Sequence, residues 1–218
     1  MYHFIEDKKY LRIIRRECSD AVNRLVTLIN NDSVMKVEMH IVGSGAKNLE
    51  TQNENEPIDL DYNLNIIGIY EVDINDCKSI KEYVRMQFNK ALKSKGWKDC
   101  QDSTSALTTE KRHITEDNKT LVSIDLAIVV DDGNRWYRLI HDKTGFVQKD
   151  RWFWNEGPSS YYLFERVNLL KETNLWEEVR EVYLNKKNFY LSKGTSNEHP
   201  SFNCYIEAVN EVYNKYKH

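Results

Sequence analysis

The chain lacks any hydrophobic run long enough to cross a membrane, and its first residues lack the apolar segment of a secretory signal. Its four cysteines include no Cys-x-x-Cys pair and no histidine at metal-ligand spacing, which argues against a zinc site or a disulfide framework. Internal repeats and low-complexity segments are also absent. These absences predict a cytoplasmic protein in a reducing compartment, without a membrane partner.

Excess positive charge is lacking too. The formal net charge is −3, from 31 basic against 34 acidic residues. The surface is therefore not broadly basic, as it is in many proteins that bind duplex nucleic acid. A local basic groove stays compatible with this charge, which leaves duplex binding only weakly supported. We interpret the basic cluster near the N-terminus as a solvated helix face rather than a phosphate-binding surface. It comprises Lys8, Lys9, Arg12, Arg15 and Arg16.

What is present suffices for a packed core. Of 218 residues, 40% are hydrophobic, and they recur at helical spacing near both ends and at strand spacing between them. We therefore predict an α+β fold, with a small mixed β-sheet and packed helices over residues 1–150 and a helical C-terminal region over residues 151–218. Predicted helices cover 4–30, 76–96, 161–172, 176–191 and 202–216, and predicted strands cover 34–42, 58–66, 105–114, 120–130 and 135–141.

Three aspartates carry the strongest chemical signal. The run Ile58–Ile66 alternates strictly between apolar and polar residues, so Asp59 and Asp61 leave the same face of one strand. Two carboxylates this close repel each other and need a counter-charge, for which a divalent hard cation is suited. Asp125 lies inside an apolar strand, where an unpaired charge is costly. We predict that it completes a carboxylate cage for metal.

A glycine–serine turn precedes the acidic strand. The segment His40–Leu49 is typical of a strand that ends at Gly43-Ser44 and opens a short helix. Backbone N–H groups and the Ser44 hydroxyl would then face whatever the metal holds, which makes the turn a candidate phosphate cradle.

These motifs, in this order, resemble the signature of the polymerase-β-like nucleotidyltransferase superfamily: a strand, Gly-Ser, a spacer, Asp-x-Asp and a third acid on a later strand. Gly43-Ser44, Asp59-Leu60-Asp61 and Asp125 match it, while the 14-residue spacer 45–58 exceeds the usual range, which indicates a local insertion at 50–57.

The resemblance implies a nucleotidyltransferase core with two Mg²⁺ ions, replaceable by Mn²⁺, bound by Asp59, Asp61 and Asp125. Gly43 and Ser44 would hold the phosphates of an NTP, with ATP as the first candidate. The implied reaction transfers an NMP to an acceptor hydroxyl with release of pyrophosphate. The acceptor stays open: a small molecule, another nucleotide, a tRNA or a protein.

A looser resemblance lies near the C-terminus. Trp154–Pro158, Arg166–Lys171 and Pro200–Val209 resemble the substrate-binding helices of the oligoadenylate-synthetase and bacterial second-messenger branch. This resemblance implies that Lys171 and Ser201 bind the nucleotide and that the C-terminal region completes the nucleotide cleft.

Other interpretations remain open. The paired acids could be the solvated face of an edge strand, and the domain could bind nucleotide without catalysis. An Asp-x-Asp motif also occurs in glycosyltransferases, but there it follows a longer nucleotide-binding half. Arg112 and His113 could contact phosphate or base, but we favour their interpretation as cross-strand surface charges. We interpret the aromatic run Trp152–Trp154 as core rather than as a base-stacking surface.

Overall fold

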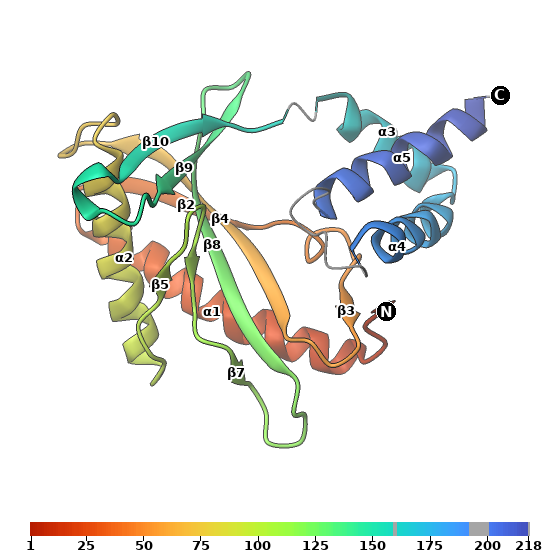
Figure 1. Cartoon of the computed structure of the whole chain (residues 1–218), viewed down its shortest axis with the longest axis horizontal. Helices are drawn as coiled ribbons and strands as arrows, with labels where there is room; N and C mark the ends of the chain where they lie inside the picture. Colours follow the sequence, from red (N-terminus) through yellow and green to blue (C-terminus); the bar gives the residue numbers. More distant parts are fainter. Residues whose placement is uncertain (159–160, 192–200, 218) are drawn as a thin grey trace. The chain divides into compact units, whose positions relative to one another are not determined.

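The computed structural model describes residues 1–158, 161–191 and 201–217 (Figure 1). The chain divides into two compact units, each built from separate stretches of sequence. We call Asp7–Lys47 with Pro57–Gly157 the sheet unit, and Met1–Glu6, Asn48–Glu56 and Pro158–His218 the helical unit.

The sheet unit is built on a mixed sheet whose main path runs in the order β10-β9-β8-β4-β2. Strands β4 and β8 are parallel, whereas the other neighbours on this path are antiparallel. Short strands β6 and β7 also pair with β8, and β5 pairs with β6. The bounds are β2 Met35–Ile41, β4 Ile58–Ile69, β5 Gln101–Asp102, β6 Leu107–Thr108, β7 Arg112–His113, β8 Leu121–Asp131, β9 Trp136–Asp142 and β10 Arg151–Glu156, with a 3₁₀ turn at Val147–Lys149.

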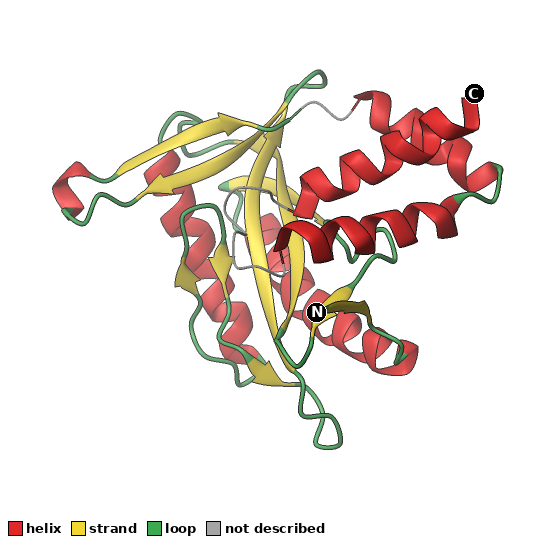
Figure 2. Cartoon of the chain, turned by 45° about the vertical axis from the view of Figure 1, so that its right-hand side comes forward, coloured by secondary structure: helices red, strands yellow, loops and turns green. Residues whose placement is uncertain are grey.

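Helices α1 (Lys8–Asn31) and α2 (Cys77–Ser94) pack together behind the sheet (Figure 2). Each begins at an aspartate whose side chain accepts a backbone N–H, Asp7 from Tyr10 and Asp76 from Ser79. The predicted start of the first helix at residue 4 is therefore wrong by four residues. The cap at Asp7 begins the helix, and the residues before it form strand β1 (Tyr2–Phe4).

Strand β4 has the alternation that its sequence predicts. Ile58, Leu60, Tyr62, Leu64 and Ile66 are all buried and supply the apolar side of the strand. The odd-numbered polar residues between them leave the opposite face. This face carries the candidate site.

The helical unit contains α3 (Tyr161–Glu172), α4 (Trp176–Leu191) and α5 (Ser201–Lys217). Its apolar cluster also includes Leu49 from the spacer before the acidic strand. The cluster consists of Leu49, Leu170, Val179, Tyr183, Cys204, Tyr205, Ala208, Val209 and Val212.

The spacer has a structural role within the helical unit. Its strand β3 (Thr51–Asn53) pairs antiparallel with β1, and the Thr51 hydroxyl accepts a hydrogen bond from Lys187 Nζ at 2.8 Å. Asn188 bonds both the N–H of Tyr2, at 2.7 Å, and its carbonyl, at 3.0 Å. The predicted insertion is thus a packed part of the helical unit.

The two units differ from the predicted division at residue 150. Strand β10 belongs to the sheet unit, and the segments 1–6 and 48–56 join the helices. Strand β10 pairs with the preceding strand β9, whereas β1 and β3 pair with each other across about fifty residues of sequence. Among the described helices, none combines the length and apolar character needed to span a membrane.

Candidate active site

The strand register gathers the three predicted acids on one face of the sheet. In the parallel β4–β8 pair, Asp59 is the partner of Ser123, and Asp61 is the partner of Asp125. Residues that are partners in adjacent strands point to the same side. All three carboxylates therefore leave the face opposite α1 and α2.

Asp125 is half-buried, whereas Asp59 is exposed. Burial raises the pKa of its carboxyl group above the ordinary aspartate value. The hydroxyl of Thr108, which donates to Asp125 Oδ1 at 2.5 Å, opposes this rise, as does the charge of Lys111, whereas nearby Asp59 adds to it. A cation at this position would stabilise the charged form.

A second hydroxyl serves Asp59. Ser123, the partner of Asp59 across the β4–β8 pair, donates a hydrogen bond to Asp59 Oδ1. Thr108 is likewise the strand partner of Asp125, in the antiparallel β6–β8 pair. Each of these acids is therefore oriented by a hydroxyl from the neighbouring strand.

Gly43 lies against Asp61. A Cβ atom added at Gly43 would be 2.5 Å from Asp61 Oδ2, and Gly43 adopts a left-handed φ of +62°. The backbone N–H of Val42 also donates to the Asp61 carbonyl at 2.9 Å. The absence of a side chain at residue 43 thus allows the turn to approach the acid closely.

The short helix predicted after this turn is wrong. Residues 43–48 form consecutive turns, and Asn48, with φ at 55°, also adopts the left-handed conformation. These left-handed residues at both ends of the segment prevent a helical run. Ser44 lies half-buried in the turn, and its carbonyl accepts the N–H of Lys47 at 3.1 Å. Any phosphate cradle here must therefore use turn N–H groups rather than a helix N-terminus.

Arg138 of β9 is a cation near the acids that the sequence did not indicate. Burial lowers the pKa of its guanidinium, and the charge of Asp61 partly offsets this. Its buried Nε has no hydrogen-bond partner among the described residues. Arg138 is the strand partner of Val129 on β8. Asp125 precedes Val129 by four residues, an even number, so Asp125, Val129 and Arg138 share one face of the sheet. Ser123, unlike Arg138, could have been found from the sequence, because it precedes Asp125 by two residues on the same strand and therefore shares its face.

The remaining candidates have different surroundings. The guanidinium of Arg112 lies 4.3 Å from the centre of the Trp97 ring, and His113 is exposed. Lys171 and Ser201 belong to the helical unit, where both are exposed, and Lys171 Nζ lies 4.9 Å from the Trp176 ring centre. The Trp152–Trp154 run is not core, because it forms part of edge strand β10 with Phe153 exposed.

In the described part of the chain, no three His, Cys, Asp or Glu side chains are arranged to hold a metal ion by themselves. The donor set nevertheless fits Mg²⁺, which takes one or two carboxylates together with substrate phosphates and water. The carboxylate oxygens of Asp61, beside Gly43, and of half-buried Asp125 lie on the same face of the sheet, where they can serve as donors. The residues therefore fit metal that arrives with a nucleotide.

Neither a protein-family model nor a curated protein sequence matches the chain. Several solved structures do match. CdnC of Escherichia coli MS115-1, solved with ATP, has a TM-score of 0.59 at 18% identity, covering 95% of this chain and 61% of CdnC.

Two further structures resemble the chain. The cyclic dinucleotide synthase CdnE of Elizabethkingia meningoseptica, with GTP and Apcpp, has a TM-score of 0.53 at 11% identity, over 90% of this chain and 69% of CdnE. GTP-bound DncV of Vibrio cholerae has a TM-score of 0.54 at 13% identity, over 88% of this chain and 47% of DncV.

At these identities the likeness shows the fold alone. It confirms the predicted α+β fold, which the chain shares with CdnC and CdnE. The chain spans about three fifths of the length of CdnC, 61%, and less of DncV, 47%.

Proposed function

We propose that this chain is a nucleotidyltransferase that moves an NMP from an NTP to an acceptor hydroxyl. The acceptor oxygen would form a bond to the α-phosphorus as the bond to the β-phosphate oxygen breaks, and pyrophosphate would leave. The observation that carries the proposal is the placement of Asp59, Asp61 and Asp125 on one sheet face, with Gly43 against Asp61.

The three acids have separate roles in this proposal. Asp59 and Asp61 bind metal together with the NTP phosphates, and Asp125 serves the acceptor side, where it can take up the hydroxyl proton. Two Mg²⁺ ions, for which Mn²⁺ can substitute, would neutralise phosphate charge and lower the pKa of the acceptor hydroxyl.

Phosphate binding is assigned to the turn and to nearby cations. The N–H groups at Gly43 and Ser44 would hold the β- and γ-phosphates. Arg138, whose Nε lacks a partner among the described residues, is a further candidate for a phosphate contact. In the helical unit, Lys171 and Ser201 remain the proposed nucleotide contacts.

A second nucleotide is the first acceptor to test. CdnE is a cyclic dinucleotide synthase whose structure contains GTP and Apcpp, and this chain shares its fold. A small molecule, a tRNA or a protein would be the alternative acceptors. The glycosyltransferase alternative loses support, because the Asp-x-Asp strand lies within a fold shared with nucleotide-bound CdnC.

Labelling would test the function directly. Each α-labelled NTP is incubated with Mg²⁺ or Mn²⁺ and either unlabelled NTPs or cell extract fractionated into RNA, protein and small molecules. The matched control is Asp59→Asn with Asp61→Asn, which keeps side-chain shape but removes both charges. We expect the wild-type chain to place label in a nucleotide product, and we expect no labelled product from the double variant.

Two results would contradict the proposal. If the double variant transferred label as fast as the wild type, the acids would not be the metal ligands. If the wild type bound NTP but labelled no fraction, the domain would be a nucleotide-binding module without catalysis.

A further inference from the structure

The short β5–β6 hairpin contacts Asp125 through two hydroxyl groups. Thr108 Oγ1 lies 2.5 Å from Asp125 Oδ1, and Ser103 Oγ lies 2.8 Å from Thr108 Oγ1. Ser103 begins the turn between the two strands, where its N–H donates to the Ala106 carbonyl at 2.9 Å. The turn and the acid are thus joined by a continuous hydrogen-bonded chain.

The direction of this chain follows from counting hydrogens. A hydroxyl carries one hydrogen, and an ionised carboxylate only accepts. The Thr108 hydrogen is used on Asp125, so the Ser103 hydroxyl must donate to Thr108. Hydrogen bonds aligned in this way polarise and strengthen one another.

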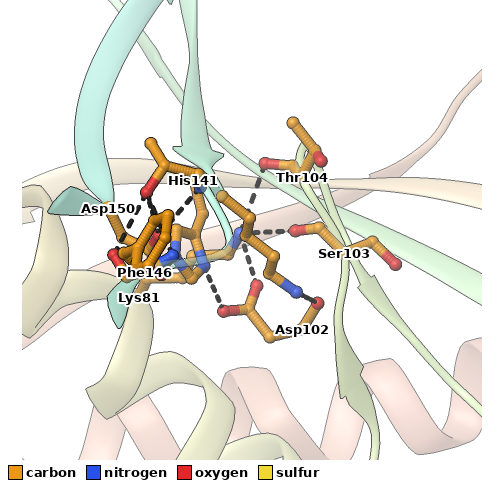
Figure 3. Close-up of polar contacts among 9 residues, drawn as sticks. Lys81, Asp102, Ser103, Thr104, His141, Phe146 and Asp150 are labelled. Carbon is orange, nitrogen blue, oxygen red and sulfur yellow. Dashed lines mark hydrogen bonds and ion pairs between the residues drawn. The ribbon is translucent and has the colours of Figure 1, made fainter. Parts of the chain in front are cut away.

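A buried lysine holds the turn from behind. Lys81 of α2 is 1% exposed, and its ammonium contacts Asp102 Oδ1 at 2.6 Å, the Ser103 carbonyl at 2.7 Å and the Thr104 carbonyl at 3.4 Å (Figure 3). These three contacts match the three N–H donors of an ammonium. The backbone of Ser103 is therefore fixed relative to α2.

His141 fixes the turn from the side of β9. Its backbone N–H donates to the Thr104 carbonyl at 2.7 Å, and its ring lies between Asp102 Oδ2, at 2.6 Å, and Asp150 Oδ2, at 3.2 Å. The ring also stacks on Trp152 with centroids 4.1 Å apart. A buried ionic cluster rarely repays its desolvation as stability, so a positioning role explains it better.

We infer that Thr108 and Ser103 are positioning residues that hold Asp125 in its reactive orientation, anchored through Lys81. The inference rests on the proposed function, because it takes Asp125 as the acceptor-side metal ligand. Thr108 bonds to Oδ1, so Oδ2 would be the oxygen more accessible to the ion. Residues that orient a metal ligand typically account for roughly 10- to 100-fold in affinity or activity.

The test compares variants at Thr108, Thr109 and Ser103. Thr108→Val removes the hydroxyl while keeping the side-chain shape, and Thr108→Ser keeps the hydroxyl. Thr109→Val is the matched control, because the buried Thr109 hydroxyl accepts the N–H of Ile124 at 2.9 Å and its contact is with backbone rather than with an acid. Mn²⁺ affinity is measured by electron paramagnetic resonance with a non-hydrolysable ATP analogue present, beside kcat and the melting temperature.

We expect Thr108→Val to weaken Mn²⁺ binding by about tenfold or more and to lower kcat, and Thr108→Ser to restore both. Thr109→Val should lower the melting temperature without changing Mn²⁺ affinity. Because Ser103 acts through Thr108, Ser103→Ala should have a smaller effect than Thr108→Val and add nothing to it in the double variant.

Wild-type Mn²⁺ affinity in Thr108→Val, or equal losses in Thr108→Val and Thr109→Val, would overturn the positioning role. If the wild type itself bound no Mn²⁺ with the analogue, the proposed function would fail at its metal site. If Thr108→Val did not fold, Ser103→Ala would test the inference instead. Unchanged Mn²⁺ affinity in Ser103→Ala would then contradict the positioning of Asp125 by the Ser103–Thr108 hydrogen-bonded chain.

Discussion

Asp61 of β4 and Asp125 of β8 are direct partners in the parallel strand pair at the centre of the sheet. Two carboxylates are thus held side by side, and Asp59 adds a third charge that raises the pKa of Asp125 beyond the effect of burial. Arg138 offers a compensating charge to Asp61. In the absence of metal, such an arrangement should cost folding stability.

We therefore expect Asp125→Asn to raise the metal-free melting temperature at neutral pH. Because burial raises the folded-state pKa of Asp125, the native state binds more protons than the unfolded state, and stability falls as pH rises through that pKa. The variant removes this loss, so its advantage should vanish below about pH 4, where the aspartate is protonated in both states. Thermal unfolding in chelator across pH measures the difference.

The same variant separates binding from chemistry. Asp125→Asn should still bind NTP through Asp59, Asp61 and the Gly43 turn, but transfer should fall by roughly a hundredfold or more. Calorimetry with a non-hydrolysable analogue and the labelling assay measure the two effects. Loss of nucleotide binding would show that Asp125 supports the whole site, and full activity would mean that a different acid acts.

Gly43→Ala should impair the site more than its backbone strain explains. The new Cβ would lie 2.5 Å from Asp61 Oδ2, in addition to the cost of a left-handed φ, about 1–2 kcal/mol. Gly96→Ala is the control, since Gly96 has φ at +70° with nothing within 4 Å of the added Cβ. We expect similar melting temperatures but at least tenfold slower transfer for Gly43→Ala only. Equal activity in the two variants would show that Asp61 tolerates displacement.

Lys171→Ala should raise the KM for NTP roughly tenfold while changing kcat less, as for a lost charge-assisted contact to phosphate. Steady-state kinetics with varied NTP measures both constants. Lys215→Ala, which removes a lysine bound to Glu178 at 3.4 Å, is the control and should leave KM unchanged. An unaltered KM in Lys171→Ala would argue against the phosphate contact, and the lysine would then be explained by its position over the Trp176 ring.

Asp102→Asn should make the chain less stable at neutral pH and its stability less sensitive to acid. Burial alone would raise the pKa of Asp102, but hydrogen bonds from Lys81 and His141 outweigh it and hold the pKa below the ordinary value. The resulting stabilisation is present above the ordinary aspartate pKa and lost as pH falls through the lower folded value.

The variant also leaves the buried ammonium of Lys81 without its acid, which typically costs about 3–5 kcal/mol. Denaturant unfolding at several pH values measures both effects. Asp99→Asn breaks an exposed pair with Lys93 at 3.0 Å and should cost less than about 1 kcal/mol. A similarly small effect in Asp102→Asn would show that water reaches Lys81.

Local periodicity predicted much of the fold. Helices α3 and α4 have the predicted bounds 161–172 and 176–191, and β4 alternates as expected, because side-chain spacing and burial of one face suffice to specify them. The start of α1 was missed, since the cap at Asp7 outweighs the apolar residue before it. The turn after Gly43 was missed because left-handed backbone is not visible in a hydrophobic pattern.

The sequence by itself determined which residues carry charge and which strand face holds Asp59 and Asp61. Only the tertiary structure decided what lies beside them: Ser123 on Asp59, Thr108 on Asp125 and Gly43 on Asp61. It also assigned the spacer strand β3 to the helical unit. The physical reason is that strand register and long-range pairing depend on which distant segments bury their apolar faces together, and no local pattern encodes that choice.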